Sequence, residues 1–114
     1  MHEASIIMGV LETVTRQCQL EGYSKINSIR LRIGKASSIL PDSLHFAFDA
    51  IKIETIARDA TLDIDIIPLG GTCAECRREF EIENYIFNCP FCNSTQILIN
   101  KGFDMEIVDM EVDE

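Results

Sequence analysis

The sequence has few of the features that membrane insertion, secretion or nucleic-acid binding require. No apolar run in its 114 residues approaches the roughly 18–20 that a membrane-spanning helix needs. The chain opens without the basic cluster and apolar stretch of a signal peptide, so we expect a cytoplasmic protein with no membrane partner. Basic residues are scarce: 10 Lys and Arg stand against 19 Asp and Glu, for a net charge of −9. Nucleic-acid binding depends on Lys and Arg contacts to phosphates, so this balance opposes it.

Catalytic motifs are also missing. The chain contains no HExxH, GxSxG, Walker loop or GxGxxG sequence. A metal hydrolase needs an open metal site beside a base in a cleft, and no motif here supplies one. The two histidines are too few for a histidine-rich metal store. We therefore expect a protein that is not an enzyme.

The periodicity of apolar residues predicts an α+β fold. With 46% hydrophobic and 25% charged residues, the chain has the composition of a globular protein large enough for one compact domain and a small satellite. Two helices and three strands are expected, over residues 4–20, 25–33, 41–55, 61–67 and 103–112. The strand–helix–strand order predicts that the first two strands are parallel. Together these elements form a three-stranded sheet with two helices.

Individual side chains in these elements carry further expectations. Cys18 lies on the apolar face of the first helix, where a small buried hydrophobe is expected rather than a metal ligand. Phe46 and Ile53 thicken the apolar face of the second helix and are expected to be buried. Arg30 and Arg32 face away from the apolar side of their strand, and if the two strands are neighbours we expect cross-strand ion pairs with Asp63 and Asp65.

A cysteine-rich module interrupts this domain. Gly70-Gly71 indicates where the chain leaves the predicted sheet, and Gly102 indicates where it returns. The predicted division is an α/β domain of residues 1–69 plus 102–114 and an inserted module of residues 70–101. Within the module, short strand-like pieces are expected around residues 80–82, 85–87 and 97–99. About 30 residues cannot bury enough apolar surface to fold unaided, so the module needs a covalent or metal staple.

The four cysteines of the module have the spacing of a structural zinc site. Cys73-x-x-Cys76 and Cys89-x-x-Cys92 each allow the chain to curl so that both sulfurs point at one centre. Two such knuckles give the tetrahedral set of four sulfurs that zinc accepts, and a closed shell leaves no position for catalysis. Two disulfides or a thioredoxin-like redox pair are the alternatives. A reducing compartment opposes the first, and neither pair opens a helix as the second requires.

Aromatic residues give the module an alternative role as a nucleic-acid-binding zinc ribbon. Phe80, Tyr85, Phe87 and Phe91 could offer stacking surfaces. Acidic residues offset the few basic ones and leave no basic face. We therefore expect these aromatics to cover the small core of the module.

The first three residues form a second candidate metal site of different chemistry. The Met1 amine, the His2 backbone nitrogen and the His2 imidazole can close fused rings around one ion, and Glu3 can add a fourth donor. Ni(II) and Cu(II), not zinc, bind deprotonated backbone nitrogen in a plane. The alternative is a solvated first helical turn in which Glu3 favours the helix dipole.

The combination of these motifs resembles the HypA/HybF family of nickel metallochaperones for hydrogenase maturation. The resemblance covers essentially the whole chain and rests on six segments together, namely Met1-His2-Glu3 before an amphipathic helix, the Ile29–Gly34 strand, the Leu40–Phe48 helix opening, the two Cys-x-x-Cys pairs and the Gly102–Ile107 strand. Some relatives carry histidines beside the zinc cysteines, and this chain has none there.

The resemblance implies a division of labour between two metals. It implies Ni(II) as cargo at Met1, His2 and Glu3, and structural Zn(II) on Cys73, Cys76, Cys89 and Cys92. It also implies work beside a nickel-associated GTPase or ATPase accessory protein. The acceptor it implies is the large subunit of a NiFe-hydrogenase and, in some organisms, urease with its own accessory proteins.

Overall fold

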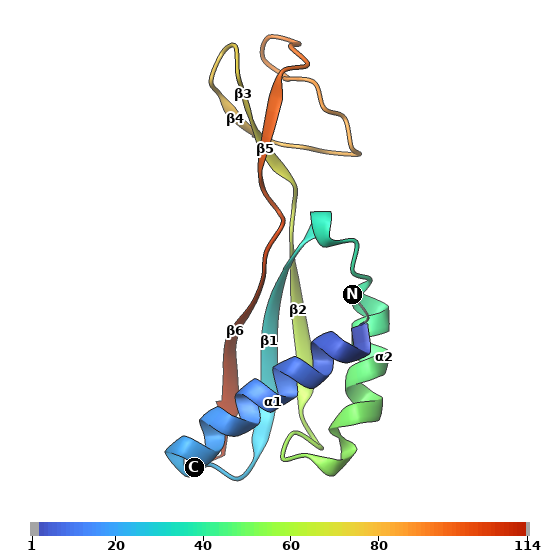
Figure 1. Ribbon diagram of the computed structural model, residues 1–114, viewed down its shortest axis with the longest axis vertical. Helices are drawn as coiled ribbons and strands as arrows, with labels where there is room; N and C mark the ends of the chain where they lie inside the picture. The colour runs from blue at the N-terminus through green and yellow to red at the C-terminus, as the bar shows by residue number, and fades with distance from the viewer. Residues whose placement is uncertain (1–2, 114) are drawn as a thin grey trace. The chain divides into compact units, whose positions relative to one another are not determined.

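The computed structural model describes residues 3–113 as two helices, six strands and two short 3₁₀ helices (Figure 1). In chain order these are α1 (Glu3–Glu21), β1 (Ile26–Gly34), η1 (Lys35–Ser37), α2 (Pro41–Ile51), η2 (Lys52–Glu54), β2 (Thr61–Ile67), β3 (Gly70–Cys73), β4 (Glu79–Glu81), β5 (Ile97–Lys101) and β6 (Met105–Val112). The predicted α+β class is confirmed, and the cysteine-rich insertion carries a second three-stranded sheet of its own.

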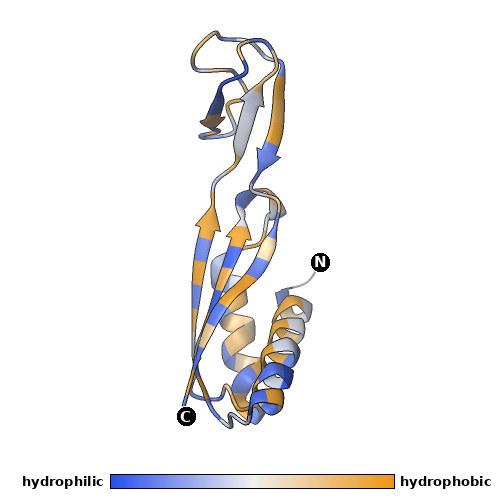
Figure 2. Ribbon diagram, turned by 90° about the vertical axis from the view of Figure 1, so that its left-hand side faces the viewer, coloured by the Kyte–Doolittle hydropathy of each residue, from blue (hydrophilic) through white to orange (hydrophobic). Residues whose placement is uncertain are grey.

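The first sheet has the strand order β2-β1-β6. The arrows of β1 and β2 point the same way, as the strand–helix–strand order predicts, and β6 runs against them (Figures 1 and 2). Hydrophobic and hydrophilic bands alternate along the strands, the pattern of a sheet with one covered face (Figure 2). Helix α1 covers that face: the Cys18 Sγ atom lies 3.8 Å from the Met110 Sδ atom of β6.

The core of this region combines α1, α2 and the first sheet. The side chains with almost no exposed surface include Ile7, Cys18, Ile26, Ile29, Leu31, Leu44 and Phe48. Helix α2 begins at Pro41, whose fixed φ suits a first turn, and Asp42 lies beside the positive end of the helix dipole. The prediction that Cys18 is a buried core residue is confirmed.

The prediction that Phe46 and Ile53 are buried is wrong, and Arg30 has a different carboxylate partner from those expected. Phe46 is 80% exposed and Ile53 51% exposed, because α2 buries a single narrow face and gives way to η2 after Ile51. Arg30 places its guanidinium 4.0 Å from Asp109 of β6. The carboxylate partner observed for Arg30 therefore comes from the strand on the opposite side of β1 to the one expected.

The second sheet has the order β4-β3-β5, with both neighbours antiparallel to the central β3. Strand β3 pairs with β5 from Cys73↔Ile97 to Gly70↔Lys101, with an irregularity between Gly70 and Gly71. Gly71 packs where a Cβ atom would lie 2.8 Å from an Ile97 methyl carbon, so a side chain there would force Ile97 to shift.

The strand-like piece predicted around residues 85–87 is not a strand: Asn84 and Tyr85 form a turn, and residues 86–87 have no regular secondary structure. Asn84 and Tyr85 both have positive φ, at 51° and 58°, and two consecutive left-handed residues cannot continue a strand. The aromatics of the insertion are also not buried as expected. Tyr85 is 59% exposed, Phe87 40% and Phe91 55%.

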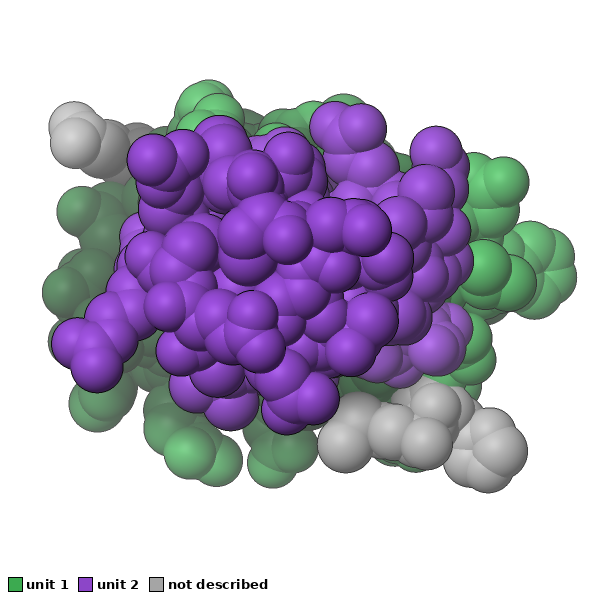
Figure 3. Space-filling view, turned by 90° about the horizontal axis from the view of Figure 1, so that it is seen from above, with its two compact units in different colours: residues 1–31, 39–65, 106–114 green, residues 32–38, 66–105 purple. Residues whose placement is uncertain are grey.

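The chain forms two compact units. Unit 1 comprises residues 1–31, 39–65 and 106–114, and unit 2 comprises residues 32–38 and 66–105 (Figure 3). Unit 2 therefore takes in the end of β1 and η1, in addition to the cysteine-rich insertion. Within residues 3–113, neither helix combines the length and apolar character that crossing a membrane requires.

Candidate metal centres

The first cysteine knuckle begins where β3 ends. The Arg77 amide donates to the Cys73 carbonyl oxygen at 2.9 Å, and the Cys73 amide donates to the Arg78 carbonyl oxygen at 3.0 Å. Arg77 has a φ of 63°, so the chain reverses directly after Cys76. The Cys76 amide also points at the Cys73 sulfur, 3.5 Å away. The turn therefore brings both sulfurs to its inner side.

The second knuckle repeats this backbone form. The Asn93 amide donates to the Cys89 carbonyl oxygen at 2.8 Å, and the Cys89 amide donates to the Ser94 carbonyl oxygen at 2.9 Å. Asn93 has the same φ of 63° directly after Cys92. The Phe91 amide lies 3.4 Å from the Cys89 sulfur. Two turns of equal geometry thus face each other with four sulfurs between them.

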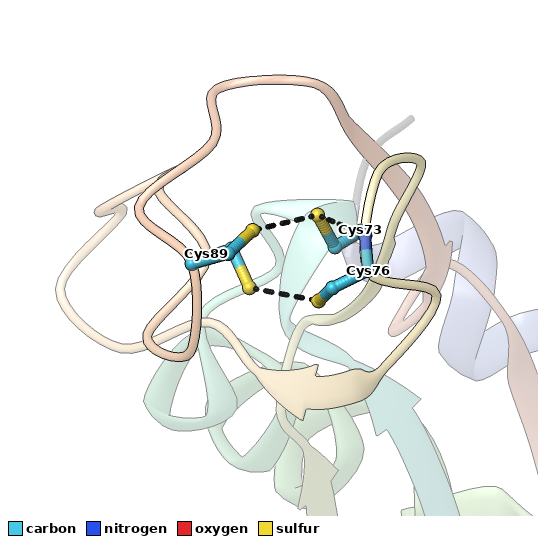
Figure 4. Close-up of side chains that lie close together, drawn as sticks. Cys73, Cys76 and Cys89 are labelled. Atoms are coloured by element: carbon cyan, nitrogen blue, oxygen red, sulfur yellow. Dashed lines mark hydrogen bonds between the residues drawn. The ribbon is translucent and has the colours of Figure 1, made fainter.

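The four sulfur atoms fit one tetrahedral metal ion. All four lie within 4.8 Å of one another, and the Cys73–Cys92 and Cys76–Cys89 sulfur pairs are each 3.5 Å apart. A regular zinc–thiolate tetrahedron with arms of about 2.3 Å has sulfur–sulfur edges of about 3.8 Å. Figure 4 shows the labelled Cys73, Cys76 and Cys89 side chains turned toward a common centre. No disulfide joins these four cysteines in the structure.

The hydrogen bonds of the knuckles help to shift the pKa values of the four thiols in different directions. The amide of Cys76 donates to the Cys73 sulfur and lowers the Cys73 pKa to about 6. The amide of Ser94 acts in the same direction on Cys92, but hydrogen bonding with Cys73 and burial outweigh it and raise the Cys92 pKa to about 12. These contacts therefore make Cys73 more acidic and Cys92 less acidic than an ordinary cysteine. A divalent ion that binds all four sulfurs must displace protons.

The N-terminal candidate site lies mostly outside the described residues, which begin after Met1 and His2. Glu3 is described and opens α1 as a half-buried residue. It lines a hollow of about 410 Å³ together with Ala4, Asp42, Ser43, Phe46 and Ala47. Two carboxylates from the first turns of two helices therefore line the same hollow. Carboxylate oxygens are donors that many divalent metal ions accept.

Asp42 is a candidate metal-ligating residue of this hollow that the sequence analysis did not identify. Its place after Pro41 indicates a helix start and predicts a dipole role only. No local pattern says that the start of α2 lies beside the start of α1. The exposed Phe46, expected in the core, belongs to the same hollow.

The fold and the closed thiolate cluster define a class: small α+β proteins that carry a zinc-ribbon-like module. The family described as "Hydrogenase/urease nickel incorporation, metallochaperone, hypA" matches residues 1–112. The chain belongs to this family of nickel metallochaperones. The resemblance inferred from the sequence motifs is thereby confirmed.

Curated relatives match over nearly their whole length. The hydrogenase maturation factor HypA of Chlorobium luteolum is 38% identical over 114 residues, which cover 100% of this chain and 97% of the relative. The HypA of Methylocella silvestris is 35% identical over 113 residues, with 99% and 100% covered. The hydrogenase maturation factor HybF of Morganella morganii is 32% identical over 111 residues, with 97% and 98% covered.

Solved structures show the same fold. The solution structure of the Ni metallochaperone HypA from Helicobacter pylori matches with a TM-score of 0.67 at 24% identity, covering 98% of this chain and 97% of that one. A second solution structure of a HypA protein matches with a TM-score of 0.72, also at 24% identity, covering 98% and 96%.

Proposed function

We propose that the protein binds Ni(II) at its N-terminus and delivers it to the large subunit of a NiFe-hydrogenase. The observation that carries this proposal is the family match over residues 1–112, which includes Met1, His2 and Glu3. The family is described by nickel incorporation into hydrogenase and urease. Urease is accordingly a second acceptor to test. In this account the protein carries metal and is not an enzyme.

Nickel is the cargo, and the donors of the proposed site suit it. The Met1 amine, the His2 backbone nitrogen and the His2 imidazole supply nitrogen in a chelate that favours Ni(II) over zinc. Glu3 and Asp42 line one hollow and can supply oxygen. The amine and the imidazole must lose protons to bind, so nickel affinity falls as pH drops below about 7.

Calorimetry with Ni(II) on zinc-loaded protein tests the N-terminal site. A one-residue N-terminal extension removes the primary amine from the chelate and should weaken binding as strongly as His2→Ala. Asp42→Ala should weaken binding less, because it removes one oxygen donor. Ser43→Ala, a neutral change in the same hollow, is the matched control. Equal nickel affinity for the extended and native proteins would contradict the proposal.

We further propose one structural zinc ion per chain on Cys73, Cys76, Cys89 and Cys92. Zinc bound there neutralises the thiolates and fixes the two knuckles to each other. In this role residues 70–101 are an inserted module that folds on metal binding, while residues 1–69 plus 102–114 form the nickel domain. Metal analysis of protein purified without added metal should find one zinc per chain. Freely titrating thiols without zinc would contradict this role.

Delivery of the ion requires partners. We propose that the protein docks a nickel-associated GTPase or ATPase accessory protein in the cytoplasm and then the acceptor apoenzyme. Affinity purification from the native host, followed by mass spectrometry, should recover both classes of partner. Recovery of nucleic acid or ribosomal proteins alone would favour the alternative function.

The alternative is a zinc-ribbon nucleic-acid-binding module. The exposure of Tyr85, Phe87 and Phe91 favours it, since exposed aromatics can stack on bases. The ring of Phe91, however, is covered by the Arg78 guanidinium at 4.8 Å, and the chain has an acidic balance. A gel-shift experiment with short DNA and RNA at physiological salt separates the two functions.

A further inference from the structure

The segment that connects β1 to α2 belongs largely to unit 2, the unit that contains the four clustered cysteines. Residues 32–38 belong to unit 2, although most of β1 and all of α2 belong to unit 1. The Gly34 amide donates to the Asp104 carbonyl oxygen at 2.7 Å, and the Ala36 amide donates to the Gly102 carbonyl oxygen at 2.8 Å. We call these two hydrogen-bonded segments, residues 34–36 and 102–104, the clasp.

The clasp is a close approach of backbones that requires glycine. A Cβ atom on Gly34 would lie 2.1 Å from the Gly102 carbonyl oxygen and 2.7 Å from the Phe103 amide nitrogen. Gly102 has a φ of +100°, and a Cβ atom there would lie 2.9 Å from the Pro68 carbonyl oxygen. These obstacles are main-chain atoms, which cannot move aside as a flexible side chain can. Any side chain at Gly34 must therefore separate the two segments.

Side chains reinforce the clasp within unit 2. The Lys35 Nζ atom lies 5.4 Å from the centre of the Tyr85 ring, on the segment between the two cysteine pairs. This distance is typical of a cation–π contact. The Ser37 hydroxyl donates to the Gly34 carbonyl oxygen at 2.8 Å and closes the η1 turn. Residues 34–37 are thus held by both the returning strand and the loop between the knuckles.

One antiparallel ladder joins the clasp to the thiolates. Cys73 pairs with Ile97 at one end of the β3–β5 ladder, and Gly70 pairs with Lys101 at the other. The next residue, Gly102, accepts the clasp hydrogen bond from Ala36. Metal on Cys73 fixes the first end of the ladder, and the ladder sets the position of Gly102. The path consists of backbone pairs along β3 and β5, with one irregularity between Gly70 and Gly71, and such a packed ladder can carry energetic coupling.

We infer that metal occupancy of the four cysteines controls whether the clasp is closed, and through it the order of the β1–α2 connection. The inference rests on the proposed structural zinc but not on nickel transport. When zinc is present, the ladder holds Gly102 and Asp104 in place, and residues 34–36 are ordered. When zinc is removed, the ladder frays, both acceptors are lost, and the connection that leads into α2 becomes free to move.

Amide hydrogen exchange on the full chain tests the inference, with zinc-loaded and chelator-treated reduced protein compared. Exchange at Gly34 and Ala36 should speed up at least tenfold on zinc removal, together with exchange at Ala74, whose amide donates to the Gln96 carbonyl oxygen beside the first knuckle. The Ile26 amide, which donates to Ile56 within unit 1, is the internal control and should change little. Faster exchange at Ala74 with unchanged Gly34 and Ala36 would overturn the clasp inference and leave the zinc role intact. Unchanged exchange at Ala74 would overturn both.

Gly34→Ala tests the same inference without touching a cysteine. The variant should expose the Ala36 amide to fast exchange while zinc stays bound at one ion per chain. Gly9→Ala is the matched control, because a Cβ atom on Gly9 of α1 meets nothing within 4 Å. Lys35→Ala, which removes only the contact to Tyr85, covers the case in which Gly34→Ala fails to fold and should raise Ala36 exchange a fewfold. Wild-type protection of Ala36 in a folded Gly34→Ala protein, or in Lys35→Ala if that is the variant that folds, would overturn the inference.

Discussion

The two units of the molecule are stabilised in different ways. Unit 1 buries a set of large aliphatic and aromatic side chains between two helices and a sheet. Among the described residues, the buried hydrophobics of unit 2 are Ile33, Leu69, Cys73, Ile82 and Cys89. Two of these are cysteines of the cluster. Several large apolar residues of unit 2 lie exposed instead, namely Tyr85, Ile86, Phe87, Phe91, Leu98 and Phe103.

This difference shows where the folding free energy of each unit comes from. Unit 1 has the apolar burial that stabilises an ordinary small domain. Unit 2 has much less of it, so in the proposed zinc role the ligation of four thiolates supplies most of its stability. A perturbation of metal should therefore act on unit 2, and a perturbation of apolar packing on unit 1.

Loss of one zinc ligand should have the largest effect. Structural zinc sites contribute apparent free energies on the order of 10–16 kcal/mol at pH 7, so Cys76→Ala should unfold the cysteine-rich insertion and abolish zinc retention. Limited proteolysis with mass spectrometry should place new cleavage sites within residues 70–101, while unit 1 amides such as Ile26 stay protected. Cys18→Ala is the control, because Cys18 belongs to the core of unit 1 and is not one of the four clustered cysteines. A Cys76→Ala protein with full zinc content and no new cleavage would contradict the view that metal ligation stabilises unit 2.

Removal of a core aromatic should destabilise unit 1 without affecting metal. Phe48 is 1% exposed and Phe46 is 80% exposed on the same helix, which makes them a matched pair. Phe48→Ala should cost about 3–5 kcal/mol of unfolding free energy, and Phe46→Ala about 0.5 kcal/mol or less. Urea unfolding followed by helical circular dichroism measures both, and zinc content should stay at one ion per chain. Equal losses for the two variants would contradict the assignment of the core.

Acid should act on unit 2 through the thiolates. In the metal-free protein, the lowered pKa of Cys73 means that its thiolate stabilises the folded state of unit 2. This stabilisation is fully present above the ordinary pKa of 9.0 and is lost as pH falls through about 6. Because zinc binds the deprotonated thiolates, protons compete with it, and zinc release to a chromophoric chelator should increase as pH falls, with about a tenfold loss of affinity per pH unit for each proton taken up. Zinc retention that does not change between neutral pH and pH 5 would argue against thiolate ligation.

The smallest effect is expected at the surface of the first sheet. The Arg30 and Asp109 side chains are 48% and 56% exposed and 4.0 Å apart. Their coupling free energy in a double-mutant cycle should be about 0.2–1 kcal/mol. Thermal unfolding of Arg30→Ala, Asp109→Ala and the double variant gives this coupling. A coupling above about 2 kcal/mol would mean that charge pairing, and not apolar burial alone, determines the stability of unit 1.

Periodicity in the sequence predicted the elements that bury a regular face. The alternation around Leu31 and the three- and four-residue steps through Val14 reflect real burial, so the strand and the helix lie where expected. The spacing of the cysteines likewise predicted their convergence, because ligand geometry is a local property of each knuckle. Elements whose form depends on local chemistry were therefore accessible from the sequence.

Features that depend on contacts between residues far apart in the sequence could not be predicted from the sequence. Gly70-Gly71 indicates a break, yet it belongs to a central strand because Ile97 and Lys101 fill the space beside it. Phe46 fits the apolar periodicity of α2 but faces outward, because the helix packs on a narrower face than the pattern indicates. The clasp at Gly34 has no sequence signature beyond a glycine at the end of a strand.

The central claim is that nickel binds at the N-terminus and zinc at the four cysteines. X-ray absorption at the nickel and zinc edges of a sample loaded with both metals tests it most directly, because each edge reports the ligands of one metal. The account predicts four sulfur neighbours at about 2.3 Å around zinc and only nitrogen and oxygen neighbours around nickel. The zinc spectrum should be the same with and without nickel. Sulfur scattering at the nickel edge, or loss of sulfur at the zinc edge when nickel is added, would contradict the division of the two metals between Met1-His2-Glu3 and the four cysteines.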